Sequence, residues 1–576
     1  MTDQKQYDLI ILGTGLGGTI LGSIMARHGR RVLLIDAGTH PRFAIGEATT
    51  PDTSFRLKLL AAKYDIPEVA YLSDFYRLRD HMSPGSGIKR SFSFLYHRPG
   101  REHDARESHQ FPTATVPWGP DCHLFRQETD SYMLTTAARH GAEVRQRTRV
   151  TDIAIDEQGV RLTSESGETF SGAYLVDAAG FRSPLAHKFE LREPADRLLT
   201  NSRALFTHMV DVTPYDRISS IGPGQGLIHP LSQGTLHHVF HGGWLWVIPF
   251  DNHEQTTNHL CSVGLLLDRD IHPDRGDDPE REFFDFVARY PSMGRQFENA
   301  RAIRDWVSTG RIQYSSQCTA GDRWFVLAHA AGFVDPLYSS GLNLTTSTID
   351  LLAAELLRAF DQGDFSGARF AHVEQAFRNN LQVYDQVVAN SYLAFQDFDL
   401  WDAWYRVWVA LLLVSSCMNL NLYFLYKESG EREVLERTER NPITGALGTG
   451  IGSCRAFYQQ ALAHMDRFRA GEASASETAR AIRELLRESD VAPAYMRLHD
   501  PEERMVPPYT APYLTRTYMW YRMRAPRDLR EHLASFTFWK SGVAALRRMR
   551  DYRKRTGTRN NHFLRDVVRT WNRDWA

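Results

Sequence analysis

The sequence predicts an α/β fold with a mixed, largely parallel sheet, followed by a mostly helical C-terminal region. Three observations support this class. A glycine-rich turn lies between two apolar runs near the N-terminus, and short strand-like segments recur up to about residue 330. Helical patterning then dominates from about residue 365 onwards. With 576 residues, the chain is long enough to bury a large core.

The first observation is a strand–turn–helix–strand succession. Residues 7–12 are an apolar run of strand length, and residues 13–18 have the spacing GxGxxG. Residues 19–28 carry small and apolar residues at helical spacing, and residues 31–35 form a second apolar run that ends at Asp36. This order is typical of a dinucleotide-binding βαβ unit. The alternative is a glycine-rich turn in an unrelated α/β protein.

Each residue type in this unit has a physical role in holding a dinucleotide. Gly13 permits the tight turn, Gly15 lets a pyrophosphate approach the backbone, and Gly18 lets the helix pack on the strand. The helix N-terminus presents unpaired N–H groups to the phosphates. Asp36 is placed to accept a hydrogen bond from a ribose hydroxyl.

Composition excludes several classes of function. The net charge of -1 gives no reason to expect nucleic-acid binding. The five cysteines are scattered without a CxxC pair, so neither a disulfide framework nor a thiolate metal site is expected. His237, His238 and His241 are interpreted as ordinary strand residues, so no metal site is predicted. The N-terminus has no basic region before its apolar run, which favours a cytoplasmic protein over a secreted one.

The segments after the βαβ unit predict an inserted β-meander. Residues 143–156, 160–164 and 169–175 are expected to form it, after a helix over residues 126–140. A parallel sheet with such an insertion is the build of two-dinucleotide-fold flavoproteins, which favours FAD over NAD. Residues 200–320 are expected to form a β-rich subdomain that covers the ring end of the cofactor.

The remaining segments complete the predicted organisation. The pattern of residues 52–63 predicts a helix. Residues 79–112 are expected to form surface excursions, and residues 88–96 within them are expected to form a strand. We expect a nucleotide-binding domain over residues 1–395 and a mostly helical domain over residues 396–576.

Residues 401–426 are strongly apolar but are interrupted by Arg406, Asn419 and Asn421. Their uninterrupted apolar runs are shorter than the ~20 residues that a membrane span needs, so a buried or interfacial helix is predicted. Gly448 to Ser453 lacks the third glycine and a preceding strand, so it is not a second nucleotide loop. The Arg-rich tail after residue 525 is interpreted as a solvated helical face.

Two further motifs show a family resemblance. Residues 243–249 read GWLWVIP and match the WxWxIP motif of flavin-dependent halogenases, and residues 333–341 match their FxxPxxSxG signature at all four fixed positions. The loop with Gly46, Glu47 and Pro51 is also similar to that family. The resemblance covers roughly residues 5–395 and extends to the fold.

The resemblance implies a two-component reaction. A separate flavin reductase would supply FADH2, and O2 with chloride or bromide would give hypohalous acid beside the flavin. The acid would move through a tunnel to a lysine, and an electron-rich carbon of a phenolic, pyrrolic or carrier-protein-tethered substrate would take the halogen. Such a pathway belongs to specialised metabolism, including antibiotic biosynthesis.

Lys89 is the expected catalytic lysine, because its segment KRSFSF resembles the lysine strand of the family. An ammonium can orient hypohalous acid, and a desolvated amine can form an N–halogen bond. The alternative is a solvent-exposed lysine on an edge strand. Lys58 and Lys63 lie on a predicted amphipathic helix and are weaker candidates.

The two motifs also assign halide and tunnel residues by resemblance. Ser339, Ser340 and Gly341 are expected to place N–H groups and a hydroxyl near the flavin and the halide, with Ser339 counted as catalytic. The alternative for these serines is a helix N-cap, which is compatible with that role. Trp244 and Trp246 are expected on one face of a strand, where they also suit core packing.

We assign further cofactor contacts to a set of residues on the loops and strands around the expected FAD site. These residues are Glu47, Arg126, Val150, Asp177, His329, Pro336 and Gly341, beside Gly13, Gly15, Gly18 and Asp36.

Two positions depart from the family pattern. Tyr338 stands where tryptophan halogenases carry a Glu, which argues against free tryptophan as the substrate. Ala328 and His329 replace a Gly-Asp pair whose Asp contacts the flavin, so His329 is a candidate replacement. Two other functions are compatible with the fold: a flavin monooxygenase or hydroxylase, and a non-catalytic flavoprotein.

Overall fold

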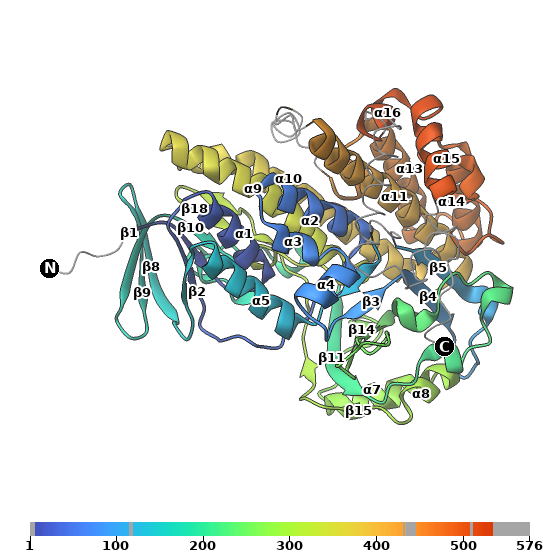
Figure 1. Ribbon diagram of the computed structural model, residues 1–576. Coiled ribbons are helices and arrows are strands. Elements are labelled where there is room, and N and C mark those ends of the chain that lie inside the picture. Colours follow the sequence, from blue (N-terminus) through green and yellow to red (C-terminus); the bar gives the residue numbers. More distant parts are fainter. Residues whose placement is uncertain (1–5, 114–118, 430–432, 434–444, 507–510, 534–576) are drawn as a thin grey trace.

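The computed structural model describes residues 6–113, 119–429, 433, 445–506 and 511–533. Figure 1 shows the nucleotide-binding sheet at one end, a second sheet beside it, and helices packed along both. The predicted α/β class with a helical C-terminal region is confirmed.

The first sheet is the predicted parallel one. Its strands follow the order β17-β18-β10-β1-β2-β7, and β1 pairs in parallel with both β10 and β2. Ile11 therefore lies between Leu34 and Val176 in register, and all three are buried. The strands are β1 (Gln6–Leu12), β2 (Val32–Ile35), β7 (Glu143–Arg145), β10 (Thr169–Asp177), β17 (Ala320–Gly321) and β18 (Trp324–Val326).

The inserted meander is smaller than predicted. Strands β8 (Val150–Asp156) and β9 (Gly159–Ser164) pair antiparallel with each other, and β9 pairs with β10. The expectation that residues 143–156 form one meander strand is wrong at its start. Residues 143–145 form β7, which instead pairs in parallel with β2, because Leu34 of that strand is opposite Val144.

The second sheet contains the predicted β-rich subdomain and two strands from earlier in the chain. Its order is β15-β11-β14-β13-β12-β4-β5, with β16 also on β11. The strands are β4 (Ser91–His97), β5 (Ser108–Pro112), β11 (Ser202–Val210), β12 (Thr235–Phe240), β13 (Gly243–Pro249), β14 (Cys261–Asp268), β15 (Arg301–Ala302) and β16 (Val307–Ser308).

The prediction of surface excursions over residues 79–112 is confirmed for residues 98–107, which are exposed or half-buried, and wrong for the strands on either side. Strands β4 and β5 are buried along their whole lengths, because β4 pairs in parallel with β12 on one side and α11 covers it.

The single strand predicted over residues 88–96 is also divided at Arg90. Residues Gly87–Lys89 form β3, which pairs with β6 (Asp121–His123), and β4 begins at Ser91. Arg90 donates its N–H to the Gln233 carbonyl, and its own carbonyl accepts from the Thr113 N–H, so the chain changes sheets there.

Helices cover the two sheets. The described α-helices are α1 (Leu16–Arg27), α2 (Pro51–Lys63), α3 (Pro67–Tyr71), α4 (Phe75–His81), α5 (Arg126–Arg139), α6 (Pro184–Lys188), α7 (Pro279–Val287), α8 (Pro291–Phe297), α9 (Ser340–Gln362), α10 (Gly367–Ala394), α11 (Phe398–Ser429), α13 (Gly452–Arg469), α14 (Ala475–Glu488), α15 (Ala511–Met523) and α16 (Arg527–Leu533). The Arg-rich tail beyond residue 533 lies outside the described residues.

Helix α11 is the buried helix that its composition predicted. It is long and apolar enough to cross a membrane, but 83% of its most apolar window is buried inside the protein. Trp401, Tyr405 and Trp408 of this helix pack against Phe94 of β4. Residues 446–448, which end at the first glycine of the rejected motif, form a short 3-10 turn against the same helix.

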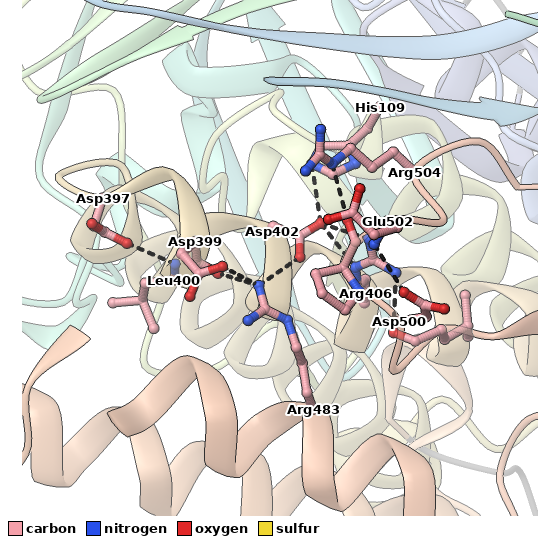
Figure 2. Close-up of polar contacts among 12 residues, drawn as sticks. His109, Asp397, Asp399, Leu400, Asp402, Arg406, Arg483, Asp500, Glu502 and Arg504 are labelled. Carbon is pink, nitrogen blue, oxygen red and sulfur yellow. Dashed lines mark hydrogen bonds and ion pairs between the residues drawn. The ribbon is translucent and has the colours of Figure 1, made fainter. Parts of the chain in front are cut away.

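Figure 2 shows the polar contacts that join α11 to the rest of the chain. Asp402 is 1% exposed and accepts hydrogen bonds from Arg406 at 2.8 Å and from Arg483 of α14 at 2.8 Å. His109 of β5 lies 3.4 Å from the same carboxylate. One carboxylate therefore connects the second sheet to two C-terminal helices.

We predict that Asp402→Ala destabilises the protein by about 3–5 kcal/mol, because it leaves two guanidinium groups without their buried counter-charge. Asp399→Ala is the matched control. Asp399 pairs with the same Arg483 but is 51% exposed, so its loss is expected to cost less than about 1 kcal/mol. Thermal melting of both variants checks this, and equal melting temperatures would contradict it.

Candidate active site

A cavity of about 560 Å³ lies at the carboxyl ends of the parallel strands. The glycine turn, the end of β2 and the loop after β10 line it, with the start of α9 opposite. Helix α1 begins at Gly15 without a side-chain cap, so its first N–H groups face this cavity. Four arginines also line it: Arg42, Arg126, Arg149 and Arg182. The lining thus suits a large anionic ligand.

The glycines of the turn have separable roles. Gly13 has φ +92°, and Gly18 lies so close to the turn that a Cβ there would be 2.1 Å from the Gly13 carbonyl oxygen. At Gly15, by contrast, a Cβ would meet nothing within 4 Å. Gly13 and Gly18 therefore shape the turn, and Gly15 keeps space open in the cavity.

Asp36 lies at the end of β2 and lines the cavity, as the sequence predicts. Its carboxylate accepts from the Thr14 N–H at 2.8 Å and from Arg42 at 2.6 and 2.8 Å. Burial raises the pKa of Asp36, but the Arg42 guanidinium and the N–H donors outweigh it and lower the pKa to about 2. Asp36 is therefore an ionised acceptor, and Arg42 is a site residue that no sequence motif marked.

Three more predicted residues line the cavity: Arg126, Val150 and His329. Arg126 is fixed by Asp130 at 2.7 Å and by the Ile45 carbonyl at 2.6 Å. The His329 ring has no hydrogen-bond partner at Nε2 and lies against the α9 N-terminus, where a Cβ on Gly341 would be 2.7 Å from that nitrogen. Burial lowers the pKa of His329 to about 4, so its ring is neutral.

Other predicted cofactor residues lie behind the cavity wall. Glu47 is buried and bonds to His208 at 2.8 Å, and the Asp177 carboxylate accepts from the Ala179 N–H, Ser183 and the Leu185 N–H. The carboxylates of Glu47 and Asp177 hold the loops after β2 and β10 in place, and neither residue lines the cavity. Gly18, Pro336 and Gly341 are also outside its lining.

The loop over residues 333–341 precedes α9. Ser339 occupies the N-cap position in the left-handed region, with φ +52°, and its hydroxyl makes no capping bond. The N-cap explanation therefore does not account for the Ser339 side chain, while its strained backbone is held by the surrounding loop. Ser340 is buried, and its hydroxyl lies 3.5 Å from the Asp335 carbonyl oxygen.

Trp244 and Trp246 lie on one face of β13, as alternation predicts. Both are buried in the core that includes the nucleotide-binding sheet, whereas Leu245 and Val247 between them belong to a separate core on the other face. Gly264 is opposite Trp246 in register and leaves room for its indole ring. Core packing, the alternative explanation, is therefore also satisfied.

Lys89 lies at the end of β3 and is 0% exposed. Its Nζ has no hydrogen-bond partner and lies 3.5 Å from the centre of the Phe92 ring. Burial lowers the pKa of Lys89, and the nearby Asp121 opposes that shift. The alternative of an exposed edge-strand lysine is wrong, because β3 is enclosed between β6 and the second sheet.

An aromatic layer separates Lys89 from the loop at the α9 N-terminus. Phe92 and Phe94 of β4 stack near His237 of β12, and Phe94 lies 6.3 Å from the Tyr338 ring. Tyr338 stacks on Trp408 of α11 at 4.4 Å and bonds to Ser391 at 2.7 Å. The described residues contain no cluster of histidine, cysteine and carboxylate side chains able to hold a metal ion.

The fold and cavity define a nucleotide-binding flavoprotein class: a βαβ unit with its glycine turn, an inserted meander, and a second sheet that carries the WxWxIP motif. The chain belongs to the family described as tryptophan halogenase, whose model matches residues 106–407.

Relatives show how far this likeness extends. The chain is 39% identical to the monodechloroaminopyrrolnitrin halogenase PrnC of Pseudomonas fluorescens, over 92% of this chain and 94% of the relative. It is also 39% identical to the tetracycline 7-halogenase of Kitasatospora aureofaciens, over 92% and 95%. The crystal structure of halogenase PltM in complex with phloroglucinol and FAD superposes with a TM-score of 0.82 at 34% identity, covering 87% of this chain and 99% of that one.

We predict opposite outcomes for two valine substitutions in the glycine turn. Gly15→Val leaves the melting temperature of the ligand-free protein unchanged and weakens FAD binding at least about tenfold, since it fills open cavity space. Gly18→Val destabilises the fold by about 1–3 kcal/mol, because its side chain overlaps the Gly13 carbonyl. Fluorescence titration with FAD and thermal melting check both. The same loss of stability in both variants would refute the separation of roles.

Proposed function

We propose that this protein is a reduced-FAD-dependent halogenase that transfers chlorine or bromine to an electron-rich aromatic small molecule through Lys89. The observation that carries the proposal is the position of Lys89. Its amine is fully buried, has no hydrogen-bond partner, and lies against Phe92, which belongs to the aromatic layer that contacts Tyr338 in the loop before α9.

The cavity residues fit FAD. The glycine turn and the α1 N-terminus would hold the pyrophosphate, Asp36 would accept from the ribose, and His329 would lie at the flavin end, against Gly341. When bound in its reduced form, FAD supplies electrons to O2 so that chloride or bromide is oxidised to hypohalous acid.

Other residues would act on the halide and the acid. The N–H groups around Ser339, Ser340 and Gly341 bind the halide, and Trp244 with Trp246 keeps the substrate away from the nucleotide cavity. Lys89 then holds the acid by hydrogen bonding or as an N–halogen species.

The substrate side is aromatic and neutral. Tyr338 stands where a substrate-activating carboxylate would be required for tryptophan, and burial raises its pKa, so it is un-ionised. A phenol or a pyrrole carries its own activating oxygen or nitrogen. The names of the two relatives at 39% identity and the PltM complex refer to small molecules, whereas two relatives at 23% and 22% identity are named for a pyrrole on a peptidyl-carrier protein. We therefore infer a free substrate for this chain.

A separate reductase is the inferred partner. The sequence contains one complete dinucleotide fingerprint, and that fingerprint serves the FAD cavity. We infer that FADH2 arrives from a flavin reductase in the cytoplasm, where a reduced nicotinamide supply exists.

The halide dependence of the product tests this function. The protein is incubated with a flavin reductase, NADH, FAD and either bromide or chloride, with phloroglucinol and pyrrole-2-carboxylate as probe arenes. We expect a monohalogenated product with the isotope pattern of the halide supplied. A hydroxylated product that forms equally well without halide would instead establish a monooxygenase.

We predict that Lys89→Met lowers the yield of halogenated product at least about 100-fold, within the range of acid–base and nucleophilic groups. Oxidation of FADH2 and release of hypohalous acid remain, because the FAD cavity does not include this residue. The control is Lys188→Met, whose lysine is 38% exposed beside Asp152 and which should halogenate like wild type. Undiminished halogenation by Lys89→Met would remove Lys89 from the mechanism.

A further inference from the structure

Asp121 faces Lys89 across the small two-stranded sheet. In the antiparallel pair β3–β6, Lys89 is directly opposite Asp121, so the two side chains lie on the same face. Both residues are 0% exposed. Lys89 Nζ and Asp121 Oδ2 are both buried without a hydrogen-bond partner. Buried polar atoms are almost always paired, so two such atoms on opposed side chains indicate a place for a reacting molecule.

One oxygen of Asp121 is fixed and the other is available. Ser54, in the first turn of α2, donates its hydroxyl to Asp121 Oδ1 at 2.7 Å. This bond orients the carboxyl group and leaves Oδ2 without a hydrogen-bond partner, like Lys89 Nζ. The Phe92 ring lies 3.5 Å from the same Nζ. The site therefore has an amine, a carboxyl oxygen and an aromatic wall.

Other ionisable groups also surround this pair. The charge of Lys58 lowers the pKa of Asp121, and the charge of Asp74 raises it. Cys122, His123 and His237 lie near Lys89. Burial and Lys89 lower the pKa of both histidines, and burial raises the pKa of Cys122, so these three groups are neutral. Lys58 is bonded to the Ser73 carbonyl at 2.6 Å, and Asp74 accepts from the Tyr76 N–H at 3.0 Å.

Burial moves the two facing groups toward their neutral forms. It raises the pKa of Asp121, against the effects of Ser54 and Lys89, and it lowers the pKa of Lys89, against the effect of Asp121. Burial therefore brings the two pKa values close together, so that a proton can pass between the carboxyl group and the amine. Such an arrangement suits proton transfer during nucleophilic attack.

We propose that Asp121 is the proton-transfer partner of Lys89 in forming the N–halogen species. This inference rests on the proposed function. As Lys89 Nζ attacks the halogen of hypohalous acid, the N–halogen bond forms and the O–halogen bond breaks. The Asp121 carboxyl group gives its proton to the leaving hydroxide, which departs as water. The Asp121 carboxylate then takes a proton from the halogenated ammonium, which leaves a neutral haloamine and restores the acid.

The test compares Asp121→Asn and Asp121→Glu with wild type and Lys89→Met. Each protein is mixed with FADH2, oxygenated buffer, bromide and phloroglucinol in a single-turnover experiment. The experiment is repeated from about pH 5 to about pH 9 in steps of about one pH unit. Brominated product, FADH2 oxidation and hypobromous acid captured by a 1,3-diketone are measured. Asp74→Asn is the matched control, because it removes a nearby acid while Asn preserves the helix cap.

We expect Asp121→Asn to lower the bromination rate about 100-fold, with FADH2 oxidation unchanged and more hypobromous acid released. The acid side of its pH profile shifts to lower pH, because Asp121 no longer raises the pKa of Lys89. Asp121→Glu restores much of the rate, and Asp74→Asn stays within about twofold of wild type.

A second variant keeps the test decisive if Asp121→Asn fails to fold. Ser54→Ala removes a hydrogen bond that lowers the pKa of Asp121, so the acid stays protonated to higher pH and the alkaline side of the profile moves up. Wild-type rates and profiles in Asp121→Asn, or an unmoved profile in Ser54→Ala, would overturn the role of Asp121. Full bromination by Lys89→Met would instead overturn the proposed function.

Discussion

The burial of one amine is the constraint on which the rest of the site depends. A lysine side chain is rarely buried, because removing an ammonium from water costs several kcal/mol unless it is paired. Lys89 has no hydrogen bond at Nζ and is enclosed by Phe92 and β6. The protein therefore holds an amine whose pKa is lowered by burial and which lies against an aromatic ring.

The two sheets and α11 produce this burial together. The second sheet supplies β4 and β12 beneath the amine, and α11 places Trp401, Tyr405 and Trp408 over β4. Asp402 of α11 joins this helix to α14 through its ion pair with Arg483, which Figure 2 shows. The C-terminal helices thus form part of the wall of the site, although its chemistry is assigned to residues before position 345.

Much of this arrangement could be predicted from local sequence. The βαβ unit, the meander and the buried nature of α11 follow from apolar periodicity and turn residues, and the cavity forms where the glycine turn predicts it. The strands within residues 79–112 were mispredicted as surface segments because the Gly, Pro, His and Arg content of this stretch suggests solvent exposure. Their burial depends on pairing with β12, more than 130 residues later, which no local pattern reveals.

The residues of the candidate site also divide into those that local sequence predicts and those that depend on the fold. Asp36 and Gly15 follow from motif spacing and line the cavity, whereas Glu47 and Asp177 turn out to fix its loops from behind. Asp121 and Arg42 stand in no motif. The role of Asp121 depends on the antiparallel register that brings it opposite Lys89, which the sequence does not determine without the fold.

In the proposed mechanism, halogen reaches Lys89 inside the protein and not through solvent. The most direct measurement is a competition with an excess of a methionine-rich protein, which consumes free hypohalous acid but is too large to enter the active site. If transfer is internal, the yield of halogenated arene stays unchanged as this scavenger is increased. If the yield falls in proportion to the scavenger, the acid is released before it reacts, and the account is contradicted.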